Sequence, residues 1–132
     1  MTCARTVTMD ADSNTIKQGD VFWIQADKLR PCVPGATHPH VVVQADVLNR
    51  SRIPTVVVCA LTSNVQQSDQ PGNVLLDAGE AGLPRRSVVV VSQVSTVEKT
   101  QLGEHIGTLT ATRVQQILAG MRFQQRSFFE RR

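Results

Sequence analysis

Cysteine is scarce in this chain, and its scarcity argues against two kinds of stabilising site. The 132 residues include three cysteines, Cys3, Cys32 and Cys59, and no two of them have CxxC spacing. An odd number without such spacing argues against a disulfide framework and a zinc site, and it favours the reducing cytoplasm. A chain of this length buries enough apolar surface to fold without either. We therefore expect a cytoplasmic protein with no metal or cofactor.

Long hydrophobic runs are also absent. The longest apolar stretches have the length of a β-strand, so we expect no membrane-spanning segment. Residues 1–14 lack the apolar core of a signal peptide. Both observations favour a protein that acts without a membrane.

Aromatic residues make up only 4% of the chain, which has no tyrosine. Few rings are therefore available to stack on the bases of single-stranded RNA. The net charge of +3 permits nucleic-acid binding without requiring it. Trp23 lies in an otherwise apolar run, so we expect it to be a core or dimer contact.

The apolar residues that are present form short runs rich in valine, a β-branched residue typical of strands. Several runs are apolar at consecutive positions, which predicts strands covered on both faces. The chain has the size of one domain. Residues 1–15 are polar and without periodicity, which indicates a loose leader. The predicted strands are residues 21–24, 41–43, 54–61, 74–76, 87–91 and 106–109.

Two segments between these strands have their own patterns. Residues 27–39 contain three prolines and one glycine, and a long loop of this kind is more often functional or mobile than decorative. Residues 97–102 are predicted to form a short helix that ends at Gly103.

The C-terminal part of the chain has helical periodicity. Apolar residues recur at i, i+3, i+4 and i+7 from Val114, and Thr110 or Thr112 can cap this helix. A basic tail, residues 125–132, follows it. The sequence therefore predicts an α+β, mostly β domain over residues 16–124, with five or six curved, mainly antiparallel strands and a C-terminal helix.

Five motifs occur in order along the chain. They are QGDVFWI at 18–24, HPHVVVQAD at 38–46, ALTS at 60–63, GEAGL at 79–83 with SVVVVSQV at 87–94, and HIGTL at 105–109. These motifs resemble GDVVWV, RPVVVIQND, TVIVAPITS, GEGGL with SVVLVDQV, and IGRLS of the MazF/PemK family of toxin ribonucleases. The resemblance covers about residues 16–123.

This resemblance implies both a fold and a function. The fold would be an SH3-like small barrel of curved antiparallel strands with a C-terminal helix. The function would be that of a metal-independent endoribonuclease that cleaves single-stranded RNA, chiefly messenger RNA, at a short sequence. The implied partners are a second copy of the chain, single-stranded RNA and a cognate antitoxin that lies across the RNA-binding groove.

The chain departs from the family where the family has arginines. His38 stands where the family has the arginine that contacts the scissile phosphate, and Ser95 stands at the arginine of its QVR motif. Val90 and Ser92 occupy the positions where PemK-like members place Arg and Asp. Thr62, in contrast, matches the family's threonine.

His38, Thr62 and His40 are the candidate catalytic residues. Metal-independent cleavage uses the ribose 2′-hydroxyl as nucleophile, so it needs a base, a donor to the charged phosphorane and an acid for the leaving 5′-oxygen. Histidine, with an ordinary pKa of roughly 6.5, suits proton transfer near neutrality. Residues two apart in a strand point to the same side, so both imidazoles can face one cleft while Thr62 donates to the phosphate. The alternative is that both histidines are solvated loop residues.

Seven further residues are candidates for contacts with RNA. The arginines among them can follow a phosphate backbone, although each arginine pair also fits a solvated turn. The others match or flank family motifs. The seven are Ser63, Gln93, Thr96, Arg50, Arg52, Arg85 and Arg86. His105 is expected to be a surface residue in front of the last strand.

Two other functions remain open at this point. Because the family arginines are missing, the domain could bind an antitoxin or nucleic acid without cleaving RNA. A gyrase poison of the CcdB type shares the barrel. Its action depends on a C-terminal helix that ends in Trp and small residues, whereas this chain ends in FFERR.

Overall fold

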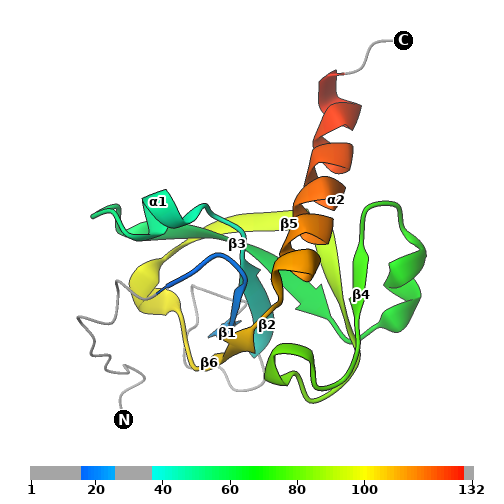
Figure 1. The fold of residues 1–132 in the computed structure, drawn as a ribbon, viewed down its shortest axis with the longest axis horizontal. Coiled ribbons are helices and arrows are strands. Elements are labelled where there is room, and N and C mark those ends of the chain that lie inside the picture. Colours follow the sequence, from blue (N-terminus) through cyan, green and yellow to red (C-terminus); the bar gives the residue numbers. More distant parts are fainter. Residues whose placement is uncertain (1–15, 26–36, 130–132) are drawn as a thin grey trace.

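The computed structural model describes residues 16–25 and 37–129. One antiparallel sheet of six strands forms the body, in the order Val74–Leu76, Ser87–Glu98, Thr55–Thr62, Thr37–Val42, Asp20–Gln25 and His105–Thr108, and a C-terminal helix rises from it (Figure 1). This confirms the predicted fold class. The elements are β1 (Asp20–Gln25), β2 (Thr37–Val42), α1 (Asp46–Asn49), β3 (Thr55–Thr62), η2 (Val65–Asp69), β4 (Val74–Leu76), η3 (Glu80–Gly82), β5 (Ser87–Glu98), η4 (Lys99–Gln101), β6 (His105–Thr108) and α2 (Ala111–Phe129). Among the described helices, none is long and apolar enough to cross a membrane.

The sheet has an apolar cluster on each side. Cys59 and Leu61 of β3 pack in one cluster together with Ile117 of α2. Val56 and Val58 of the same strand belong to the other cluster. The strand pleat explains this division, because successive side chains point to opposite faces. We call the two sides the α2 face and the opposite face.

β5 is bent where it passes β3. Val94 pairs with Cys59 and Val89 pairs with Leu61, so residues 90–93 bulge opposite the single residue between them. Asn73 supports this bulge, because its side-chain oxygen accepts a hydrogen bond of 3.0 Å from the backbone N–H of Val91. A bulge bends its strand and increases the local twist, which contributes to the curl of the sheet (Figure 1).

Two predictions about the ends of strands were wrong. Residues 97 and 98, expected to start a helix, extend β5 because Val97 pairs with Val56. Of the helix predicted at 97–102, only η4 is helical. Residues 37–39, expected to be loop, belong to β2 because they pair with β1. In both places the hydrogen bonds of the sheet override a weak local pattern. The rest of the predicted loop and the predicted leader lie outside the described residues.

Thr110 caps α2, as predicted. Its hydroxyl oxygen accepts a hydrogen bond of 3.2 Å from the backbone N–H of Arg113. The helix continues to Phe129, beyond its apolar periodicity, and its C-terminal end projects away from the sheet (Figure 1). Gly120 lies against the backbone of Gly72, so close that a Cβ atom at Gly120 would overlap the Gly72 carbonyl oxygen.

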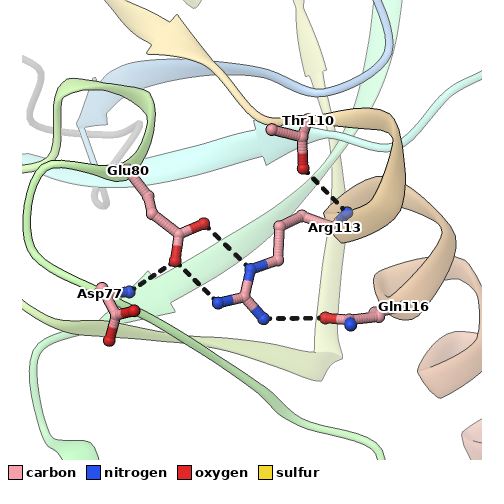
Figure 2. Close-up of polar contacts among 5 residues, drawn as sticks. All are labelled: Asp77, Glu80, Thr110, Arg113 and Gln116. Atoms are coloured by element: carbon pink, nitrogen blue, oxygen red, sulfur yellow. Dashed lines mark hydrogen bonds and ion pairs between the residues drawn. The ribbon is translucent and has the colours of Figure 1, made fainter.

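A bidentate ion pair ties the first turn of α2 to the loop between β4 and β5 (Figure 2). The Nε and Nη2 of Arg113 donate to the two carboxylate oxygens of Glu80 at 3.0 and 2.8 Å. The backbone N–H of Asp77 donates to the same carboxylate at 2.8 Å, and Arg113 also donates to Gln116 at 2.9 Å. The hydrogen bond from Arg113 holds the pKa of Glu80 below its ordinary value and, in return, raises the pKa of Arg113.

Candidate active site

β2 carries His38 and His40 on the opposite face of the sheet. His38 pairs with Ile24 of β1, and His40 pairs with Phe22 of β1 and Ala60 of β3. Ile24 and Phe22 belong to, or pack against, the apolar cluster of this face. Directly paired residues point to the same side of a sheet. The pleat and the register therefore place both imidazoles on one surface.

The imidazole of His40 has a defined orientation. Its Nδ1 lies 3.0 Å from the backbone carbonyl oxygen of His38. A carbonyl only accepts, so in the neutral ring Nδ1 carries the hydrogen and Nε2 keeps its lone pair. The pKa of His40 lies below its ordinary value, mainly because the side chain is buried. The backbone hydrogen bond to His38 raises this pKa in part, and the charge interaction with the His38 side chain lowers it further. His40 is thus a neutral imidazole near pH 7 with one nitrogen ready to accept a proton.

Thr62 lies at the end of β3 on the same face. It is two residues from Ala60, the partner of His40. The last β2–β3 pair is at His40, and continuing this antiparallel register by two residues puts His38 across from Thr62. The Thr62 hydroxyl oxygen accepts a hydrogen bond of 3.1 Å from the backbone N–H of Asn64. Its own hydrogen therefore remains available for donation to an anion.

Four of the predicted RNA-contacting residues lie near this end of β3. Ser63 follows Thr62 directly and is exposed. Gln93 is exposed in the β5 bulge opposite the partner of His40. Arg85 and Arg86 are exposed in front of β5, whose first paired residues lie next to Thr62. The structure therefore brings these four residues to the region of the histidines.

The other three predicted residues lie elsewhere. Arg50 and Arg52 precede β3, and the seven residue steps from Thr55 to Thr62 span about 23 Å at the rise of a β-strand. Thr96 pairs with Val57, which packs on the α2 face. The structure does not bring these residues together with Thr62.

A third histidine on the opposite face was not recognised in the sequence as part of a site. His105 of β6 pairs with Phe22 on the side of β1 away from His40. Its neighbour is the buried carboxylate of Asp20. In the sequence, Asp20 is noticeable as a charged residue directly before an apolar run, but no local pattern connects Asp20 with His105.

Known proteins resemble this chain over most of its length. Residues 17–124 match the family described as PemK-like, MazF-like toxin of type II toxin-antitoxin system. The chain is 34% identical over 107 residues to endoribonuclease MazF6 of Mycobacterium tuberculosis H37Rv, covering 81% of this chain and 94% of that protein. It is 33% identical over 91 residues to endoribonuclease EndoA of Bacillus subtilis, covering 69% of this chain and 78% of that protein.

Solved structures share the fold. A mycobacterial endoribonuclease in complex with its cognate antitoxin superposes with a TM-score of 0.63 at 17% identity, over 83% of this chain and 91% of that chain. The toxin MazF-mt6 of M. tuberculosis gives a TM-score of 0.63 at 24% identity, over 77% and 91% of the two chains. Since the family match spans most of the sequence, the chain belongs to the PemK-like, MazF-like toxins of type II toxin–antitoxin systems.

Proposed function

We propose that this protein is a toxin endoribonuclease that cleaves single-stranded RNA, chiefly messenger RNA, at a short sequence and without a metal ion. The observation that carries the proposal is the arrangement of His38, His40 and Thr62 on one face, with Nε2 of His40 free to take a proton. The curated relatives named endoribonucleases support it. It acts in the cytoplasm, where messenger RNA is present.

The proposed reaction is a transesterification within the RNA strand. Nε2 of His40 takes the proton of the ribose 2′-hydroxyl, and the 2′-oxygen attacks the adjacent phosphorus. The bond from phosphorus to the 5′-oxygen breaks, and the leaving 5′-oxygen takes a proton from an acid, for which His38 is the candidate, so that the products carry a 2′,3′-cyclic phosphate and a 5′-hydroxyl. Thr62 donates a hydrogen bond to a phosphate oxygen and stabilises the charge that develops there, and charge stabilisation is the second role open to His38. His38 thus occupies the place of the family's arginine.

We also propose two protein partners. The first is a second copy of this chain, and the second is a cognate antitoxin that covers the RNA-binding surface. The antitoxin is supported by structural neighbours, which include an endoribonuclease in complex with its cognate antitoxin and MazE–MazF from Deinococcus radiodurans. The second copy rests on the resemblance to the family. Sedimentation of the purified protein tests the first proposal, since a single 14.5 kDa species at micromolar concentration would refute it.

The test of the ribonuclease is cleavage of a labelled single-stranded RNA in the presence of a chelator. His40→Ala is expected to lower the rate on the order of 10²–10⁴-fold, the usual range for a lost acid–base group. Because His40 must be neutral, the wild-type rate should also fall as the pH drops below the lowered pKa of His40. Gln115→Ala, at an exposed position of α2, is the control and should cleave like the wild type. The cleaved RNA should carry a 2′,3′-cyclic phosphate.

His38→Arg separates the two roles open to His38. If His38 only stabilises charge, arginine should match or raise the activity, since its planar guanidinium fits phosphate oxygens. If His38 transfers a proton, arginine should be as slow as His38→Ala, because arginine holds its proton too tightly.

The absence of the family arginines at His38 and Ser95 favours one competing function. In that case the domain binds an antitoxin or nucleic acid and does not cut RNA. A wild-type protein that cleaves no RNA at any pH, yet binds its antitoxin, would refute the ribonuclease and establish this binding function.

A further inference from the structure

The three histidines of the chain lie on one face of the sheet. Phe22 of β1 pairs with His40 on one side and with His105 on the other. The rings of Phe22 and His105 are in contact, with centroids 5.2 Å apart and planes inclined by 65°. His105, Phe22 and His40 therefore form a row across three neighbouring strands.

A buried carboxylate orients His105. Nε2 of His105 lies 3.4 Å from Oδ1 of Asp20, a residue only 5% exposed. The same carboxylate accepts hydrogen bonds from the hydroxyl of Thr108 at 2.7 Å and from the backbone N–H of Lys17 at 2.9 Å. These contacts fix one edge of the imidazole, while 49% of the side chain remains exposed. Such a ring is pre-organised and still accessible.

His105 is too far from Thr62 to act on the same phosphate. Three strand spacings separate β6 from β3, which is about 14 Å at the usual interstrand distance. A second phosphate contact is also disfavoured, because Asp20 would offset a positive charge on the ring. What remains for a ligand is the exposed half of the side chain, and single-stranded RNA is commonly bound by stacking its bases on aromatic rings, including histidine.

We propose that the His105 ring, held by Asp20 and Phe22, is a stacking subsite for a base of single-stranded RNA outside the cleaved bond. This inference rests on the proposed ribonuclease function, because it assigns a further part of the same RNA-binding surface. The row formed with His40 places the subsite beside the reacting group. RNA that extends from the active site across β1 reaches it.

The experiment measures binding of a fluorescently labelled single-stranded RNA whose riboses are 2′-O-methylated. This probe lacks the nucleophilic hydroxyl, so binding is separated from cleavage. Two variants, H105A and H105N, remove the aromatic ring, and H105F keeps an aromatic face. Q115A is the control, at an exposed position of α2. Thermal melts establish that each variant is folded.

H105A and H105N are expected to bind about 5- to 150-fold more weakly, the range for one lost base–aromatic stack. H105F and Q115A should bind like the wild type. The slope of log affinity against log salt concentration should be the same for H105A and the wild type, because stacking releases no counterions.

Four results would overturn the inference. The first is wild-type affinity in H105A and H105N, and the second is no binding of the probe by the wild type. The third is an equal loss in H105F. The fourth is a salt slope smaller by about 0.7 in H105A, the signature of one lost phosphate contact to a single strand. Cleavage of unmodified RNA is measured in parallel, so that a wild type that binds through His105 but does not cut refutes only the ribonuclease.

Discussion

We expect the ion pair between Glu80 and Arg113 to contribute to the stability of the fold. Two charge-assisted hydrogen bonds join the groups, and hydrogen bonds of this kind contribute about 1.5–3 kcal/mol each when they are well shielded. Here the side chains of Glu80 and Arg113 are 24% and 26% exposed, so water screens the pair. In the variant, water can also replace part of the lost hydrogen bonding. We expect Glu80→Gln to lower the free energy of unfolding by about 1–2 kcal/mol at neutral pH.

The effect of Glu80→Gln should disappear in acid. The pKa of Glu80 is held below its ordinary 4.5 in the folded protein, chiefly by the hydrogen bond from Arg113. A carboxylate with a depressed pKa stabilises the fold at pH values above its unfolded pKa, and this stability is lost as the pH falls through the folded pKa. Wild type and variant should therefore differ at pH 7 and converge once the pH falls below the depressed pKa of Glu80 in the folded protein.

Urea denaturation of four proteins tests this reasoning. They are the wild type, Glu80→Gln, Arg113→Gln and the double variant, whose comparison isolates the coupling between the two side chains. Glu104→Gln is the matched control, because it neutralises an exposed glutamate and should change stability little. A coupling near zero at pH 7, or a Glu80→Gln effect that persists unchanged at low pH, would refute the assigned role of the pair.

Three further predictions concern packing and burial. Gly120→Ala should lower the free energy of unfolding by about 1–3 kcal/mol despite the better helix propensity of alanine, because its Cβ would meet the backbone of Gly72. Equal or higher stability would contradict this, and Gln115→Ala is the control on the same helix. Asn73→Ala should cost a similar amount, about 1–3 kcal/mol in urea denaturation, because the N–H of Val91 loses its acceptor. Burial raises the pKa of the Cys59 thiol to about 12, so mass spectrometry should find Cys59 alkylated in urea but not in native buffer at neutral pH.

Much of the fold follows from short-range patterns in the sequence. Runs of valine predicted the strands, because a β-branched residue suits the pleated sheet wherever its neighbours lie. Thr110 and the apolar positions Val114 and Ile117 predicted the start and the buried side of α2. The pairing of His38 and His40 on one side of a strand needed only the period of two.

The extent of some elements depended on partners far along the chain. Residues 97 and 98 resemble the start of a helix, yet they complete β5 because β3 offers paired backbone groups. Residues 37–39 contain a proline and still form strand against β1. In both cases tertiary hydrogen bonds outweigh local preference, which is small per residue.

The sequence by itself thus determined where the strands and the C-terminal helix lie, though not their full extent, as well as the family and the shared side of the two histidines of β2. Only the tertiary structure decided what stands beside them. Strand register pairs His40 with Ala60, two residues before Thr62, and sets Phe22 between His40 and His105. Asp20 reaches its hydrogen-bond partner Thr108 across 88 positions of sequence. No local periodicity encodes such neighbours, because register and bulges depend on the cooperative pairing of the whole sheet.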